Sequence, residues 1–375
     1  KRLTLEVPPG YLDDVGLGDS IDLLGGANIL ETRPIIGSGA TVQVAIGDLD
    51  RSASLQSTML FSGRSTFNSD GTNTLGQLDR SGSGLVFLSK LNGSAYSAAG
   101  MVNGIIGGWA IAYGDSYSFA TYSDATGVGQ MTATQFTAGA IPTTAASSLK
   151  TANYDNAASR TLATGSHLAN SWRLSGGAAN TITFASGATL TLGAGLVTNG
   201  DFAYTLAASN STNTITGAAA ADGGDGNIYL FVAPNTGTNV TSIRPKITGT
   251  SSLVSSGNGT LQLAPQYTAN DYSGGTFVNA GTLNLSSRAQ ISLGSASIAP
   301  TTSTITMPST SGFIVGMMIS NANFPAGTKI TAVNAGSLVV DTTSTNATTQ
   351  SSQTILSRDA WAALPVAGSL TVTNA

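Results

Sequence analysis

The stretch SGNGTLQLAPQYTANDYSGGTFVNAGTLNL, residues 256–285, decides the fold. It contains one phrase twice, GTLQL at 259–263 and GTLNL at 281–285, in which a glycine precedes alternating apolar and polar residues. Alternation with a period of two is typical of a β-strand with one buried face. Glycine supplies the backbone conformations that tight turns need. Gly259 and Gly281 lie 22 residues apart, a separation typical of one coil of a solenoid.

The same phrase recurs elsewhere in the chain. Its five copies are SGATVQV (38–44), SGATLTL (186–192), GNGTLQL (257–263), NAGTLNL (279–285) and VAGSLTV (366–372). Their unequal spacing predicts coils of unequal length. A glycine-rich β-sandwich or barrel is the alternative, and helical patterning is nearly absent. The sequence therefore predicts an all-β parallel solenoid.

The composition supports this prediction and excludes several partners. The chain of 375 residues has 46 glycines, no cysteine, 9% charged residues and a net charge of -4. Typical soluble domains carry about 25% charged residues, so this surface must be covered by Ser, Thr, Asn and Gly. A chain without a basic cluster is not expected to bind nucleic acid. No apolar run of about 20 residues predicts a membrane span, and the first residues lack a signal peptide, so we expect a mature or excised segment.

One segment differs from the coil pattern. Residues 303–343 hold five short strand-like runs separated by Pro, Gly and Asn turns, with apolar residues such as Phe313, Met317 and Phe324. These residues suffice for a small β core of their own. We predict solenoid coils with long loops over residues 1–296, an inserted small β module over 297–357, and a return to the coil over 358–375.

Residues 256–285 resemble the autotransporter-associated β-strand repeat of large bacterial surface proteins. The matching residues are Gly257, Gly259, Thr260, Leu261, Leu263, Asn270, Tyr272, Gly274, Gly275, Thr276, Asn279, Ala280, Gly281, Thr282 and Leu283. This segment has one residue more than the pattern between Asn270 and Tyr272, either Asp271 or its neighbour. The resemblance implies a right-handed parallel β-helix that is exported and displayed at the cell surface, in which these residues have structural roles.

We therefore predict a structural or adhesive segment of an exported surface protein, forming a stiff rod or extracellular fibre, with no enzymatic activity and no cofactor. Neither end of the solenoid has the polar or Pro-rich sequence of a cap, so the expected partners are further coils of the same polypeptide or another copy, end to end, and surface glycans. The alternative is a carbohydrate-binding or polysaccharide-cleaving β-helix. Such an enzyme needs acids on adjacent coils. Asp48 and Asp50 share one strand face, but the sequence shows no matching acids one coil away.

Three further features of the sequence are candidates for a site. Asp222, Asp225 and Asn227 in ADGGDGNIYLF partly match the calcium-binding turn of β-rolls, with a structural turn as the alternative. His167, the one histidine, lacks partners for a zinc site and is expected at the surface or in a turn.

The third candidate is aromatic. Tyr113, Tyr117 and Trp109 are candidates for a surface that stacks on sugar rings. Packing under a loop, or capping of the solenoid, is the alternative role for these side chains.

Overall fold

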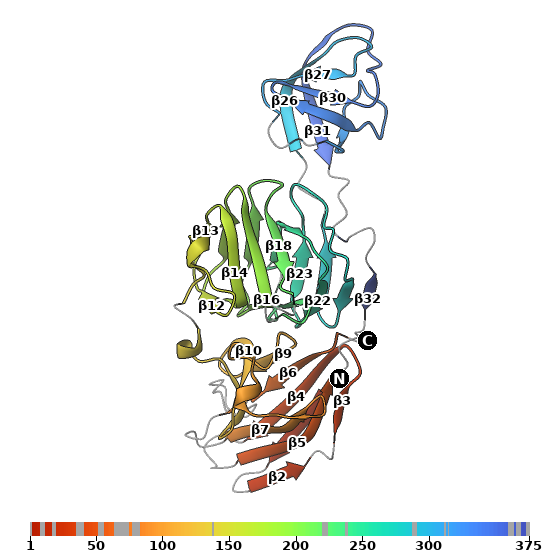
Figure 1. Ribbon diagram of the computed structural model, residues 1–375. Coiled ribbons are helices and arrows are strands. Elements are labelled where there is room, and N and C mark those ends of the chain that lie inside the picture. The colour runs from red at the N-terminus through yellow and green to blue at the C-terminus, as the bar shows by residue number, and fades with distance from the viewer. Residues whose placement is uncertain are drawn as a thin grey trace.

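The computed structural model describes residues 2–7, 12–16, 20–34, 41–51, 56–63, 75–76, 83–136, 139–219, 224–236, 239–286, 291–310, 313, 315–358, 364 and 369–372. These residues form strands joined by turns and short 3-10 helices, which confirms the prediction of an all-β chain with parallel sheets. Figure 1 shows three parts, which we call the first stack, the second stack and the antiparallel unit.

The first stack consists of two parallel runs of strands. One run is β1 (Arg2–Val7), β4 (Ala27–Pro34), β6 (Thr58–Ser62) and β9 (Ala110–Tyr113). The other is β2 (Leu12–Gly16), β5 (Thr41–Arg51) and β7 (Ser83–Leu91), with β3 (Ile21–Leu23) and β8 (Ser94–Ala95) at its side. The antiparallel pair β10 (Tyr117–Ser123) and β11 (Gly127–Gln130) joins β9 to β7 and closes this end of the stack.

The second stack winds around three faces. The first face contains β12 (Asn153–Asn156), β14 (Gly165–Leu174), β16 (Ala188–Thr198), β19 (Asn227–Phe231), β22 (Ser252–Ser256), β24 (Thr276–Val278) and β32 (Leu370–Val372). The second contains β13 (Arg160–Leu162), β15 (Asn180–Phe184), β17 (Tyr204–Ala208), β20 (Thr241–Ile243), β23 (Thr260–Leu263) and β25 (Thr282–Leu285). The third contains β18 (Thr214–Gly217) and β21 (Lys246–Ile247), which stack on the first half of β16. All neighbours within these faces are parallel.

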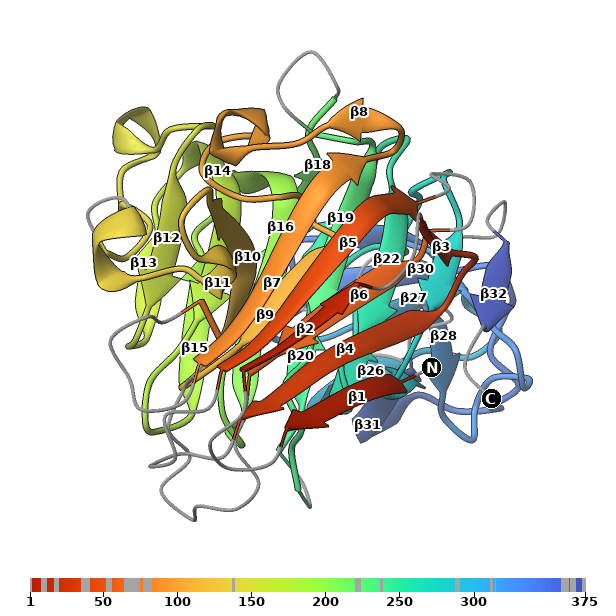
Figure 2. The same cartoon turned by 90° about the horizontal axis from the view of Figure 1, so that it is seen from below.

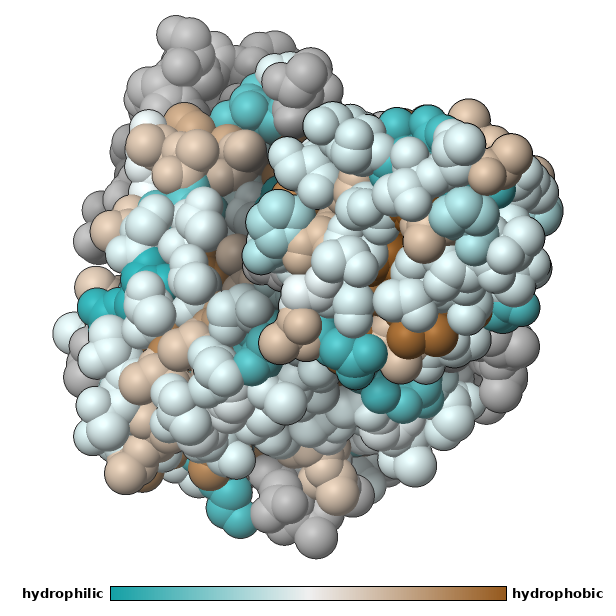
Figure 3. Space-filling view, turned by 90° about the horizontal axis from the view of Figure 1, so that it is seen from above, coloured by the Kyte–Doolittle hydropathy of each residue, from teal (hydrophilic) through white to brown (hydrophobic). Residues whose placement is uncertain are grey.

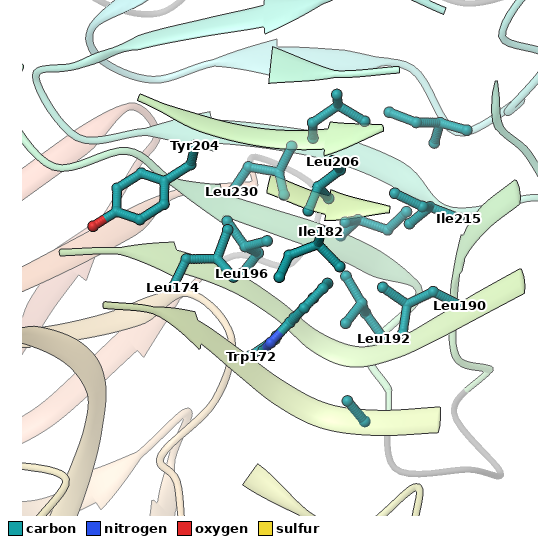
Figure 4. Close-up of a cluster of buried hydrophobic side chains, with 14 of the residues drawn as sticks. Trp172, Leu174, Ile182, Leu190, Leu192, Leu196, Tyr204, Leu206, Ile215 and Leu230 are labelled. Atoms are coloured by element: carbon teal, nitrogen blue, oxygen red, sulfur yellow. The ribbon is translucent and has the colours of Figure 1, made fainter. Parts of the chain in front are cut away.

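Apolar columns fill the interior of the second stack. Side chains at every second position point inward, among them those labelled in Figure 4: Trp172, Leu174, Ile182, Leu190, Leu192, Leu196, Tyr204, Leu206, Ile215 and Leu230. Each is almost fully buried. Burying one such side chain stabilises the fold by about 1.5–3 kcal/mol, so adjacent coils are held by both their core and their main-chain hydrogen bonds.

The two stacks pack face to face. On β19, Ile228 and Leu230 point into the second stack, while Tyr229 and Phe231 belong to clusters shared with the first stack. The whole strand is buried, which explains its continuous apolar sequence. Figure 2 shows the strands of the first stack crossing those of the second at an angle.

Successive strands are added in opposite directions along the two stacks. Tyr117 at the end of the first stack contacts Phe231, whereas Asn279, near the end of the second stack, bonds Thr58 in β6. The order of the strands along the first stack thus runs opposite to their order along the second. Strand β3 of the first stack and β32 of the second accordingly lie on the same side of the molecule (Figures 1 and 2).

The antiparallel unit lies between β25 and β32. Its strands are β26 (Ile291–Ile298), β27 (Thr304–Thr306), β28 (Met318–Ser320), β29 (Ile330–Asn334), β30 (Ser337–Val340) and β31 (Gln350–Arg358). They enclose a separate apolar core that includes Ile305, Phe313 and Met317. Strand β32 then pairs with β24, so the chain rejoins the second stack where it left it. The boundaries expected at residues 296 and 357 stay predictions.

The short 3-10 helices lie in the connections, at Ala98–Gly100, Ala133–Gln135 and Ala145–Ser147. No helix in the described ranges combines the length and the apolar character needed to cross a bilayer.

Candidate functional site

The stretch 256–285 contains β23, β24 and β25, which belong to the last coils of the second stack. Thr260 pairs with Thr282 and Leu261 with Leu283, so the 22-residue spacing of the sequence is the register of two stacked strands. Leu261 and Leu263 are buried in the core. Ser252 donates a hydrogen bond through Oγ to the carbonyl of Gly274 on the next coil, at 2.6 Å. The repeat therefore builds two successive coils in register.

Two of its glycines stand where the turns of adjacent coils touch. Gly281 has φ +77°, and a Cβ built on it would lie 2.4 Å from the carbonyl oxygen of Gly257. Gly257 has φ +84° and approaches the carbonyl of Val232 in the same way. Gly259 accepts the bond from Thr282 N at 3.0 Å. Only glycine combines this backbone conformation with so close a contact.

The middle of the repeat turns the chain from the second face to the first. Asn270 is buried and accepts a hydrogen bond from Ile247 N at 2.8 Å. Tyr272 is fully buried, and its hydroxyl lies 2.5 Å from Oγ1 of Thr276, the first residue of β24. The adjacent Gly275 has φ +90°. These polar side chains satisfy buried groups at the bend, as a turn inside a solenoid requires.

Asn279 has a role that the sequence does not reveal. It is buried, and its Nδ2 donates to the carbonyl of Gln56 at 2.7 Å and to Oγ1 of Thr58 at 3.3 Å. Both acceptors belong to the first stack. The asparagine of the repeat therefore links the two stacks.

Residues 253–285 match the family model of the passenger-associated-transport-repeat. This chain contains a passenger-associated-transport-repeat. The resemblance that residues 256–285 show is thereby confirmed, and the transport repeat points to a passenger domain of autotransporter-type surface proteins. Neither the curated proteins nor the solved structures contain a significant match to the chain.

The transport repeat ends at an open sheet edge. Among the described residues, β25 and β32 have no further strand on their outer side. Leu285, Leu370 and Val372 are about half exposed there. An unpaired edge with apolar side chains is a template for another strand.

The opposite end of the second stack is capped, contrary to the expectation that neither end has a cap. Residues 139–149 cover β12 and β13: Asp155 N donates to the carbonyl of Gly139, and Ala163 N to that of Thr143. Ile141 enters the core, and its carbonyl accepts a bond from Arg160 Nη1 at 2.7 Å. The cap carries no charged residue, and it lies in the middle of the chain instead of near either end of the sequence.

The proposed calcium ligands are only partly described. Asp222 lies outside the described residues. Asp225 accepts hydrogen bonds from Asn227 N at 3.1 Å and from the hydroxyl of Tyr229 at 2.7 Å. No group of three or more acidic or histidine side chains in the described ranges has the arrangement of a metal site. Calcium binding at this turn stays a prediction.

The three aromatic candidates fall into two clusters. Tyr113 and Tyr117 are partners across the β9–β10 hairpin, and their rings stack with centroids 4.2 Å apart. Tyr117 also packs on Phe231 of the second stack. Trp109 belongs to another cluster, where it lies 5.5 Å from the guanidinium of Arg51. A sugar-stacking role for the three residues stays a prediction.

The acids of β5 have a neighbour that the sequence reading missed. Asp50 is the register partner of Asp22 on β3, so an acid does lie on the adjacent strand. Asp48 pairs in register with Lys90 and accepts hydrogen bonds from Gly93 N at 3.0 and 3.2 Å. The 28-residue offset between Asp22 and Asp50 differs from the 22-residue repeat spacing, so the repeat pattern does not align the two acids.

The expectation of a surface histidine is wrong. His167 is fully buried in β14, and its Nε2 lies 2.9 Å from the carbonyl of Ala163. Alternate residues of a strand point to the same face, so His167 points inward with Ala169. Its register partner on β16 is Leu190, which is also buried.

A buried charged cluster lies between the stacks, where the only signal in the sequence is the apolar run IYLFV at 228–232. Arg51, at the end of β5, donates through Nη2 to the hydroxyl of Tyr229 at 2.5 Å and through Nε to the carbonyl of Ser57 at 3.0 Å. Its Nη1 lies 3.8 Å from the carboxylate of Asp225. Burial, followed by the charge of Asp225, raises the pKa of Tyr229 well above its ordinary value. The phenol therefore stays neutral and donates to Asp225 while it accepts from Arg51.

Proposed function

We propose that this chain is a structural segment of an exported passenger, displayed outside the cell, in which right-handed β-helical coils form a rigid rod or fibre that acts in adhesion. The observation that carries the proposal is the transport repeat, built as stacked coils that end at the open edge of β25 and β32. The partner at that edge is a further coil of the same polypeptide or a second copy. The cap at the other end makes growth of the second stack one-directional.

The character of the surface supports a structural role. Figure 3 shows a face that is mostly pale, with scattered strongly hydrophilic residues and small apolar patches. Neutral hydroxyl and amide groups cover such a surface, and burial of the apolar columns stabilises the fold. A solenoid of this kind keeps its shape without charge pairs on its outside.

We further propose that the chain is not an enzyme. Asp48 is engaged by the Gly93 amide and faces Lys90 in register, and Asp50 faces Asp22. Polysaccharide cleavage through these acids is the competing function. Measuring reducing ends released from polysaccharides by the full chain tests it: turnover that disappears in an Asp48→Ala variant would replace the structural proposal by the enzymatic one.

Surface display is tested on intact cells of the source organism. Antibodies raised against the full chain should label unpermeabilised cells, and external protease should remove the signal while a cytoplasmic marker stays intact. Labelling that appears only after lysis contradicts the proposal. Electron microscopy of the released native polypeptide should show a rod, and its mass on a denaturing gel distinguishes a long covalent solenoid from assembled subunits.

A further inference from the structure

A polar cavity lies at the junction of the two stacks, beside the buried Arg51. Its volume is about 340 Å³, at the small end of the range of about 300–1,000 Å³ for ligand pockets. The walls come from the end of β5, the turn after β7 at Asn92 and the loop 100–109 of the first stack. The floor is Asn170 with Gly193 and Ala194 of the second stack, and Asp225 lies at the side.

The floor is a β-bulge. Ala169 pairs with Leu192 and Ser171 with Gly195, so the single residue Asn170 faces two residues, Gly193 and Ala194. A bulge bends the strand and often adjoins a functional site. Here the loop 100–109 packs against the bulge, and Asn103 Nδ2 donates a hydrogen bond to Asn170 Oδ1 at 3.1 Å.

Hydrogen-bonding groups without protein partners line this cavity. Within the described residues, the indole Nε1 of Trp109 and the amides of Gly107 and Gly108 donate to no acceptor. Asn92 Oδ1 accepts from Arg51 N at 2.7 Å, which leaves its Nδ2 available as a donor. The side chain of Asp225 is 41% exposed and supplies acceptor oxygens. Val102, about half exposed, adds apolar surface.

We propose that this cavity binds a neutral sugar unit of a glycan. Sugar hydroxyls both donate and accept, and their CH groups need apolar contact, which matches several donors, one carboxylate and the side chains of Leu91 and Val102. Charge decides between neutral and acidic sugars. Arg51 is buried, is bound to Tyr229 and Ser57, and has its charge offset by Asp225, so no uncompensated positive charge among the described lining residues favours an acidic sugar.

The test is an array of neutral and acidic glycans probed with the full chain, followed by calorimetric titration of the strongest ligand. Asp225→Asn keeps an acceptor for the Tyr229 hydroxyl but removes the charge, and it should weaken binding about tenfold or more. Val102→Trp fills the cavity from an exposed position and should abolish binding. Asp50→Asn removes the same charge from an exposed position on the opposite face of β5, and its affinity should stay within about twofold of the parent.

Each other outcome overturns the proposal. Absence of any bound glycan does so, as does binding confined to acidic glycans or to a non-glycan partner. Binding that survives both Val102→Trp and Asp225→Asn places the ligand elsewhere. Denaturant midpoints of the variants identify misfolding, and if Asp225→Asn fails to fold, Val102→Trp still decides the result.

Discussion

Gly281→Ala tests the close stacking of the transport repeat. The residue adopts φ +77°, which costs a side-chain-bearing residue about 1–2 kcal/mol. The added Cβ would also lie 2.4 Å from the oxygen of Gly257 and 2.5 Å from that of Gly259, both of which are backbone atoms of the previous coil. Overpacking of this kind costs about 1–3 kcal/mol more. We expect the free energy of opening of the last coil to fall by about 2–5 kcal/mol.

The matched control is Gly226→Ala. Gly226 has φ +80°, but a Cβ there meets nothing within 4 Å, so only the conformational cost of about 1–2 kcal/mol remains. Hydrogen exchange of the amides of β23 and β25 measures the opening of this coil directly, which matters because the parts of the chain need not unfold together. Equal losses of protection in the two variants would refute the stacking argument.

Three further predictions follow from other parts of the fold. Burial is the main cause that raises the pKa of Tyr96 and of Tyr204 to about 12. The neutral phenols therefore stabilise the fold below pH 10, and this stability is lost as the pH rises from 10 to 12. Phenolate absorbance should show a late group of tyrosines that ionises together with the loss of β-sheet circular dichroism, and ionisation of all tyrosines near pH 10 in an intact fold would contradict this. Residues 291–358 have their own core, and their first and last strands pair with each other, so this segment should fold alone with a cooperative thermal transition; an unfolded spectrum would show that it depends on the second stack. Leu285→Lys at the open edge should reduce concentration-dependent association in sedimentation experiments, whereas Leu149→Lys, equally exposed beside the capped end, should not; equal effects would remove the edge as the site of association.

The sequence predicted the local structure well where apolar and polar residues alternate with a period of two. The alternation at 259–263 and 281–285 became the stacked strands β23 and β25 with the expected 22-residue register. The five phrase copies did not all become equivalent coils, however. The copy at 186–192 leads into β16, on a different face, and residues 41–44 of the first copy start β5 of the first stack. A glycine followed by alternation marks the start of a strand but not which face it occupies.

The candidate sites depended more on tertiary structure. The sequence offers Trp109 and Asp225 as candidates for two separate sites, whereas the fold places them around one cavity with Arg51. Arg51 and Tyr229 are 178 residues apart and meet only because the stacks pack face to face. The apolar run IYLFV at 228–232 was the one available signal, since a strand with two apolar faces has to be covered on both.

By itself, the sequence determined that the chain is all-β, that it contains a transport repeat, and that its coils turn at glycines. These features are local: the strand period, the backbone freedom of glycine and the spacing of a single coil are all contained within about 30 residues. Only the tertiary structure decided that the two stacks run in opposite directions, that one end is capped by residues 139–149, and that a polar cavity lies between the stacks. Those outcomes depend on which strand faces pack together. Apolar surfaces that are far apart in the chain can pack together without producing any periodic pattern in the sequence.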